Sequence, residues 1–95
     1  MTIAVGSLSL DPETGRADFR GVVAELTGQE TTLLSFLIRA SPAPHTSRQL
    51  LRLVWGYPPY IGNGVVARTH VCNIRKKLGA DCIRHRRGWG YYVPT

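Results

Sequence analysis

Residues 27–30 mark a change in the spacing of apolar side chains, and this change limits the possible folds more than any other feature. Across residues 1–26, apolar and polar side chains alternate with the two-residue period of half-buried strands. Across residues 33–38, leucine and isoleucine recur with the 3.6-residue period of a helix. The order of the two patterns predicts an α+β fold in which a small sheet precedes a group of helices.

The first 26 residues contain four short apolar segments, each of which predicts a β-strand. These segments are 3–5, 8–10, 17–19 and 22–26. A turn signal at Asp11–Gly15 separates the second from the third, because Pro12 fixes φ and Gly15 can adopt a positive φ. Parallel crossovers need more chain than these connections provide, so the sequence predicts a four-stranded antiparallel sheet.

Two helices are expected after the sheet. Thr27 and Glu30 have the three-residue separation of a capping box, which predicts that the first helix begins there and ends before Ser41–Pro44. Ser47 is the expected N-cap of the second helix, and Gly56 ends it. Its buried face is expected to carry Leu50, Leu51, Val54 and Trp55.

A third helix is predicted over Val65–Leu78, where apolar residues recur every three or four positions and form a stripe that faces the core. The opposite face carries short or hydrogen-bonding side chains and no acid: Arg68, Thr69, Cys72, Asn73 and Lys76. Side chains of these types can reach base edges in the major groove of DNA. The alternative is an amphipathic helix that only packs on the core.

A basic hairpin is expected near the C-terminal end. Strands over Cys82–His85 and Gly90–Val93 flank a tip at Arg86–Trp89. The order strand, helix, helix, helix, hairpin is that of a winged helix-turn-helix. A narrow cationic hairpin can enter a minor groove or clamp a phosphate backbone, whereas the alternative is a solvated loop.

The charges are distributed unevenly along the chain. The formal net charge is +6, and the sequence pI is about 10.0. Residues 1–30 hold five of the six acids, whereas residues 31–95 hold ten of the twelve lysines and arginines. An excess of positive charge confined to one part of a folded domain indicates a polyanion binder. The charge alone fits DNA, RNA or an anionic membrane surface.

The remaining motifs argue against other classes of function. Cys72 and Cys82 are too few for a disulfide scaffold and are expected to be reduced thiols of a cytosolic protein. Together with His45, His70 and His85 they match no zinc spacing, so no metal is expected. No nucleophile–base pattern or phosphate-binding glycine loop occurs, so neither catalysis nor a cofactor is expected. No membrane span or secretory signal is expected either.

Several short phrases together resemble the OmpR/PhoB-type winged-helix domain, the DNA-binding half of many bacterial response regulators. In order, they are Leu26–Glu30 with Leu33–Leu34, Ser47–Arg48, Leu50–Leu51, Val54–Gly56, Ile74–Leu78 and Arg87–Tyr91. The resemblance covers essentially the whole chain. It implies a four-stranded N-terminal sheet, three helices and a C-terminal hairpin called the wing.

The resemblance also implies roles for particular residues. The third helix would read the major groove, Arg87 of the wing would enter the minor groove, and Trp55 would lie near the DNA backbone. The segment 56–64 matches a loop that contacts RNA polymerase in some members. Cys72 and Asn73 stand where the family often has arginines, and Arg68 stands where it often has aspartate, so its sequence preference does not transfer. The usual receiver domain is absent from these 95 residues.

These observations lead to one hypothesis: residues 1–95 form a single DNA-binding domain of a bacterial transcriptional regulator, with a sheet (1–26), a three-helix core (27–79) and a wing (82–94). It would bind double-stranded DNA in the cytoplasm, at the nucleoid, as two copies on direct repeats. Expected base-reading residues are Arg68, Thr69, Cys72, Asn73 and Lys76. Expected backbone contacts are Arg48, Trp55, His70, Arg75, Arg84, His85 and Arg86.

Two alternatives remain at this point. In one, the domain is a protein-interaction module whose wing tip and Trp89 bind an acidic partner such as RNA polymerase. In the other, Tyr57 and Tyr60 stack on the bases of RNA. Steep salt dependence would favour DNA over a protein partner, and competition between duplex DNA and RNA would separate the two nucleic acids.

Overall fold

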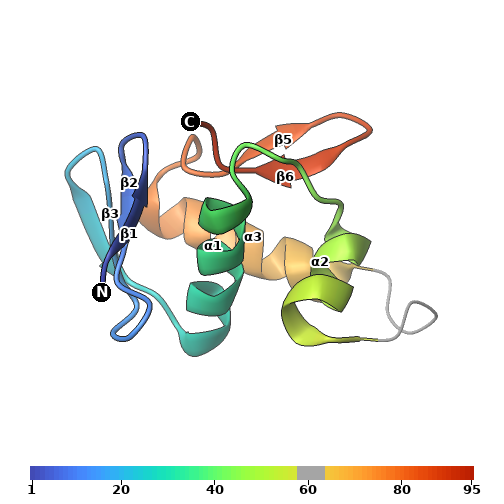
Figure 1. Ribbon diagram of the computed structural model, residues 1–95, viewed down its shortest axis with the longest axis horizontal. Coiled ribbons are helices and arrows are strands. Elements are labelled where there is room, and N and C mark those ends of the chain that lie inside the picture. Colours follow the sequence, from blue (N-terminus) through green and yellow to red (C-terminus); the bar gives the residue numbers. More distant parts are fainter. Residues whose placement is uncertain (58–63) are drawn as a thin grey trace.

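The N-terminal strands form an antiparallel sheet whose strands lie side by side in sequence order (Figure 1). In the computed structural model, which describes residues 1–57 and 64–95, the strands are β1 (Ile3–Val5), β2 (Leu8–Leu10), β3 (Arg16–Phe19) and β4 (Val22–Glu25). Leu8 lies opposite Phe19, and Leu10 lies opposite Ala17. All four of these side chains are buried, so the alternation in the sequence places one face of the sheet on the core.

Gly15 allows the β2–β3 turn to pack closely against the first helix. Its φ is +81°, and a Cβ at this position would lie 2.7 Å from the carbonyl oxygen of Leu26 and 2.9 Å from Oγ1 of Thr31. Any other residue would have to displace these atoms. The expected turn at this position is therefore confirmed, with a packing reason in addition to the conformational one.

Three helices follow the sheet: α1 (Gly28–Ala40), α2 (Ser47–Trp55) and α3 (Val65–Leu78). The expected capping box at Thr27 and Glu30 is present. The expected N-cap of α2 was wrong by one residue. Thr46 is the N-cap, because its hydroxyl accepts a hydrogen bond from the Gln49 amide (3.1 Å) while the Gln49 side chain accepts one from the Thr46 amide (2.8 Å).

The core lies between the sheet and the helices. The stripe predicted on α3 is buried, as are the leucines of α1 and α2: Ala67, Val71, Ile74, Leu78, Leu33, Leu34, Leu37, Leu50 and Leu51. In Figure 1, α3 passes behind α1 and alongside α2. Since one side of α3 is covered in this way, its other side is free to face solvent.

The C-terminal hairpin consists of β5 (Arg84–Arg86) and β6 (Gly90–Tyr92). Its first strand begins two residues later than the sequence predicted, because Cys82 and Ile83 are fully buried in the core and pairing starts at Arg84 opposite Tyr92. The hairpin is joined to the α1–α2 connection. The His45 amide donates to the Tyr91 carbonyl (2.9 Å), and the Tyr91 amide donates to the His45 carbonyl (2.7 Å).

Within residues 1–57 and 64–95, no helix combines the length and the apolar character needed to cross a membrane.

Candidate nucleic-acid interface

The outward face of α3 carries the side chains that were expected to read bases. Arg68, Thr69, Cys72 and Lys76 are exposed, and Asn73 is half-buried at the edge of this face. No acidic residue occurs in α3. The helix therefore presents hydrogen-bonding and cationic groups to solvent on one side while its opposite side is packed into the core.

A cavity of about 250 Å³ separates this face from the hairpin. It is lined by Arg68, Val71, Cys72, Arg75, Lys76, Ala80 and Tyr91. Three of these residues are cationic and none is acidic, and Tyr91 extends the lining from α3 onto β6. Tyr91 was missing from the sequence-based set, because only the register of the hairpin shows which of two adjacent tyrosines faces α3.

The register of the hairpin divides its basic residues between two faces. His85 lies opposite Tyr91, and their rings are in contact with centroids 4.9 Å apart. Arg84 and Arg86 alternate with His85 along β5 and therefore point to the other face. Arg84 lines a separate cavity with Arg20 and the C-terminal residues. The structure thus brings His85 toward α3 but does not bring Arg84 there.

The tip of the hairpin is exposed. Arg87 and Trp89 both face solvent, and 62% of the Trp89 surface is accessible. The Arg86 guanidinium lies 5.8 Å from the centroid of the Trp89 ring, within the range of a cation–π contact. This arrangement places an arginine and an aromatic ring together at the most prominent part of the hairpin.

The other expected backbone contacts have mixed environments. Arg48 is exposed in the first turn of α2. The Trp55 ring packs against His70 with centroids 5.5 Å apart, and Nδ1 of His70 is buried with no hydrogen-bond partner among residues 1–57 and 64–95. Arg75 is half-buried, and its Nε donates to the carbonyl of Ala80 (3.0 Å). Trp55 and His70 are thus held together, while Arg75 is partly engaged in ending α3.

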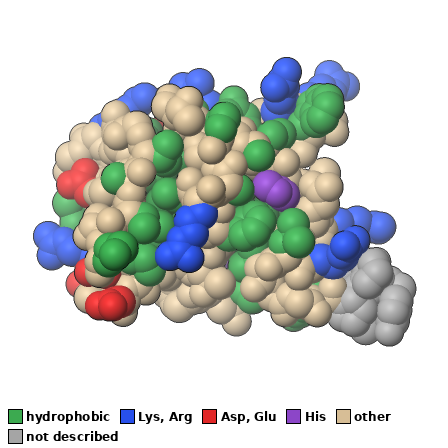
Figure 2. Space-filling model, viewed as in Figure 1, with side chains coloured by type: hydrophobic (Ala, Val, Ile, Leu, Met, Phe, Trp, Pro, Cys, Tyr) green, Lys and Arg blue, Asp and Glu red, His purple; other side chains and the backbone are tan. Residues whose placement is uncertain are grey.

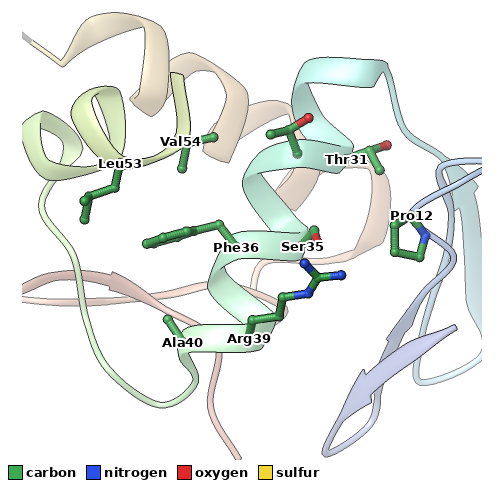
Figure 3. A pocket seen from close by; sticks show the side chains of 9 residues that line it. Pro12, Thr31, Ser35, Phe36, Arg39, Ala40, Leu53 and Val54 are labelled. Carbon is green, nitrogen blue, oxygen red and sulfur yellow. The ribbon is translucent and has the colours of Figure 1, made fainter. Parts of the chain in front are cut away.

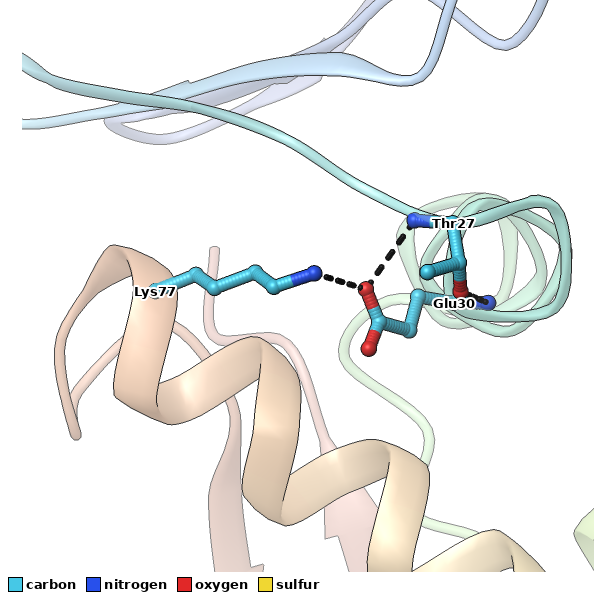
Figure 4. A network of polar contacts seen from close by, with 3 residues as sticks. All are labelled: Thr27, Glu30 and Lys77. Atoms are coloured by element: carbon cyan, nitrogen blue, oxygen red, sulfur yellow. Dashed lines mark hydrogen bonds and ion pairs between the residues drawn. The ribbon is translucent and has the colours of Figure 1, made fainter.

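Lys77 forms an ion pair with Glu30, while 36% of its side chain remains exposed (Figure 4). Its Nζ lies 2.7 Å from Oε1 of Glu30, a residue of α1 that is only 3% exposed. Burial by itself would raise the pKa of Glu30. Hydrogen bonds from Lys77 and from the Thr27 amide, with the charges of Lys77 and His70, outweigh burial and hold this pKa below its ordinary value. Sequence reasoning missed this pair, which joins residues 47 positions apart.

The side of the molecule on which α1 lies in front of α3 has a different character (Figure 2). Acidic side chains visible on this side lie at the end occupied by the sheet, whereas basic ones are spread over the whole side, the hairpin tip included. A groove of about 550 Å³ runs between α1, α2 and Pro12 (Figure 3). Among the described residues, its lining combines Phe36, Leu53 and Val54 with one cation, Arg39. This groove does not share the cationic character of the α3 face.

The described residues include no cluster of three His, Cys, Asp or Glu side chains that could hold a metal ion. Cys72 is exposed and Cys82 is buried, and burial raises the pKa of the Cys82 thiol to about 11. The segment 56–64, expected to contact RNA polymerase, lies mostly outside the described residues, as does Tyr60.

Comparison with known proteins identifies the family. Residues 21–93 match the model of the family described as "Transcriptional regulatory protein, C terminal" (Trans_reg_C). The chain belongs to this family. Among curated Trans_reg_C relatives, the regulatory protein VanRB of Enterococcus faecalis is 36% identical over 87 residues, which are 92% of this chain and 39% of VanRB. The phosphate regulon regulator PhoB of Rhizobium meliloti is 37% identical over 94 residues, 95% of this chain and 41% of PhoB.

Solved structures of DNA-binding domains agree with the fold. The DNA-binding domain of CpxR from E. coli is 30% identical, with a TM-score of 0.75, and the match covers 100% of this chain and 97% of that one. The RstA DNA-binding domain from Klebsiella pneumoniae, solved in complex with the RstA box, has a TM-score of 0.77 at 24% identity. The predicted winged helix-turn-helix and the OmpR/PhoB-type resemblance are confirmed. This Trans_reg_C chain spans about two fifths of the curated relatives it matches.

Proposed function

We propose that this chain binds double-stranded DNA as the effector domain of a bacterial transcriptional response regulator, with α3 in the major groove and Arg87 in the minor groove. The observation that supports the proposal best is the exposed face of α3. It carries arginine, threonine, asparagine and lysine with no carboxylate, directly opposite a buried stripe. An α-helix fits the major groove, where these side chains can distinguish base pairs.

Base reading is assigned to Arg68, Thr69, Cys72, Asn73 and Lys76. The Arg68 guanidinium suits the two acceptors of guanine, and the Asn73 amide suits the acceptor and donor of adenine. Replacing Asn73 with alanine should therefore change the preference at one base position, by about 1–3 kcal/mol. Selection of bound duplexes from a random pool measures this preference, and an unchanged selected sequence would contradict the role of Asn73.

Backbone contacts are assigned to residues on both sides of α3: Arg48, Trp55, His70, Arg75, Arg84, His85 and Arg86. Such contacts fix the position of the protein on the duplex without reading sequence. The paired rings of Trp55 and His70 would lie beside one strand, and the hairpin would lie beside the other. Arg84 is the weakest member of this set, because it points away from the cavity next to α3.

The function of the whole regulator extends this proposal. Two copies would bind direct repeats, segment 56–64 would contact RNA polymerase, and a receiver domain outside these 95 residues would supply the signal. The protein would act at the bacterial nucleoid in the cytoplasm. The relatives named as regulators are more than twice as long as the matched region, which leaves room for such a domain in proteins of that kind.

The salt dependence of duplex binding tests the function directly. Fluorescence anisotropy with a labelled duplex should give a log–log slope of affinity against salt near −5 if about six phosphates are neutralised. A duplex RNA of the same length should compete poorly. Binding that is insensitive to salt, or absent at low salt, would instead favour a protein-interaction module using the exposed Trp89.

Replacing Arg87 with alanine should weaken binding to all duplexes, because the wing tip contacts DNA whatever its sequence. Arg39→Ala is a matched control, since it removes the same charge from the groove of α1 and α2, away from α3. A gel-shift series compares the two variants with the parent chain. Equal affinities for Arg87→Ala and Arg39→Ala would contradict the assignment of the wing.

A further inference from the structure

Three consecutive cations end α3, but they do not have equivalent environments. Lys76 is exposed and lines the cavity next to the hairpin. The Nε of Arg75 donates to the Ala80 carbonyl. Lys77 turns the other way, and its ammonium group is 2.7 Å from the carboxylate of Glu30 in α1. A run that looks uniform in the sequence therefore contains one residue whose charge is directed toward the protein.

Glu30 is itself held firmly. Its Oε1 accepts a hydrogen bond from the Thr27 amide (3.0 Å) as well as from Lys77, and its own amide donates to Oγ1 of Thr27 (3.3 Å) (Figure 4). The Glu30 side chain is only 4% exposed, so loss of Lys77 would leave a buried charge without its partner. The first turn of α1 thus provides a fixed anchor for the last turn of α3.

A second contact holds the same flank of α3. His70 and Lys77 are seven residues apart, so they lie on one side of the helix, about 10 Å from each other along its axis. The ring of His70 packs against Trp55 of α2. Asn73 lies between them, three residues after His70 and four before Lys77, and is half-buried. Two contacts to two other helices therefore bracket one of the residues assigned to base reading.

We propose that Glu30 and Lys77 are positioning residues for base recognition: their ion pair fixes the rotation of α3 about its axis, and Lys77 makes no phosphate contact. The proposal rests on the proposed function. A side-chain atom lies about 6 Å from the helix axis, so a rotation of about 10° displaces it by about 1 Å. Since hydrogen bonds tolerate only a few tenths of an ångström, such a rotation disrupts the contact between Asn73 and its base.

Simple electrostatics and positioning predict different results for Glu30→Gln. Removing a negative charge from a DNA-binding protein should strengthen its binding to every duplex. If Glu30 positions α3, the same substitution lowers the ratio of specific to non-specific affinity. Glutamine keeps an oxygen that can accept from the Thr27 amide, so the cap of α1 is retained. A fall in the ratio of specific to non-specific affinity therefore indicates positioning, whereas a uniform gain in affinity with an unchanged ratio indicates simple electrostatics.

The experiment compares variants of the full chain on two duplexes by fluorescence anisotropy. One duplex is the best sequence from selection, and the other is its scrambled version. Lys77→Gln and Glu30→Gln should each lower the ratio of affinities by about 5-fold to 150-fold, the loss of one base contact. The double variant should lower this ratio of affinities no further than the more damaging single variant does, because both single variants remove the same ion pair. Lys77→Arg should keep most of the specificity.

Arg48→Gln is the matched control for charge, because Arg48 is exposed and is assigned to a backbone contact and not to base reading. It should weaken binding to both duplexes and reduce the steepness of the salt dependence by about one unit, as expected for a phosphate contact. Lys77→Gln should leave that slope unchanged. If Lys77→Gln instead changes the slope as Arg48→Gln does and leaves the affinity ratio intact, Lys77 is a phosphate contact and the proposal is wrong.

Loss of folding does not imitate the expected result. Partial unfolding lowers the affinity for both duplexes by the same factor, so it leaves their ratio unchanged, and circular dichroism melts define a temperature at which every variant is folded. A ratio that stays constant in folded Glu30→Gln would overturn the proposal while leaving the proposed function intact. If the parent chain itself shows no salt-dependent duplex binding, the proposed function fails first.

Discussion

At Glu30, neighbouring groups compensate for the removal of a carboxylate from water. Lys77 and the Thr27 amide both bind one of its oxygens, and the charge of His70 adds to their effect. Because these interactions outweigh burial, the pKa of Glu30 is lower in the folded chain than its ordinary value of 4.5. A group with a lowered pKa stabilises the folded state at pH values above its ordinary pKa. That stabilisation is lost as the pH falls through the folded-state pKa.

The stability of the parent chain should therefore decrease more steeply than that of Glu30→Gln as the pH falls below about 4.5. Both proteins contain the other five acids, so the difference between them isolates Glu30. Urea unfolding at pH 7, 5, 4 and 3 measures the free energy of unfolding of each. Parallel curves for the two proteins would mean that Glu30 does not gain stability from being ionised.

At the scale of the elements, the hairpin depends on the α1–α2 connection for its position. His45 and Tyr91 exchange two backbone hydrogen bonds, and the hydroxyl of Ser41 donates to the Val93 carbonyl. Gly90 makes this approach possible. A Cβ at position 90 would overlap the backbone of His45 and Thr46, and φ at Gly90 is +114°. The wing is thus hydrogen-bonded to the helical core through the α1–α2 connection and is not an independent loop.

Gly90→Ala should therefore destabilise the fold by at least about 2 kcal/mol, because it combines a positive φ with a backbone overlap. Gly88→Ala is the control, since φ there is +83° but, chain neighbours aside, no atom of the described residues lies within 4 Å of the added Cβ. It should cost only about 1 kcal/mol, the penalty of the left-handed conformation alone. Urea unfolding compares the two, and equal losses would show that contact with His45 does not hold the wing.

How far the sequence predicts each element depends on whether local spacing determines it. The bounds of α3 and the buried stripe follow from local periodicity, and both were predicted correctly. The N-cap of α2 was misplaced because Thr46 and Ser47 are both good caps, and only the Gln49 side chain distinguishes them. The faces of β5 require its register, and the pair between Glu30 and Lys77 requires the tertiary fold. Neither leaves a local signal.

At the scale of the whole molecule, charge and packing divide the surface into regions. The sheet and its turns (residues 1–26) contain four of the six acids, and the helices and hairpin contain ten of the twelve lysines and arginines. The electric field of this uneven charge distribution orients the protein so that its basic side faces an approaching polyanion before the two make contact. The groove between α1 and α2 remains apart from that side. The domain can therefore bind DNA with one surface while other surfaces stay accessible.

Alkylation of the two cysteines measures most directly whether α3 lies against DNA. Cys72 is exposed on the outward face of α3, whereas Cys82 is buried and has a pKa raised to about 11, so iodoacetamide at pH 8 should modify Cys72 alone. Adding duplex DNA should slow this modification in proportion to the fraction of chain bound, and high salt should restore it. If gel electrophoresis shows a complex while the rate at Cys72 is unchanged, α3 does not lie against the DNA.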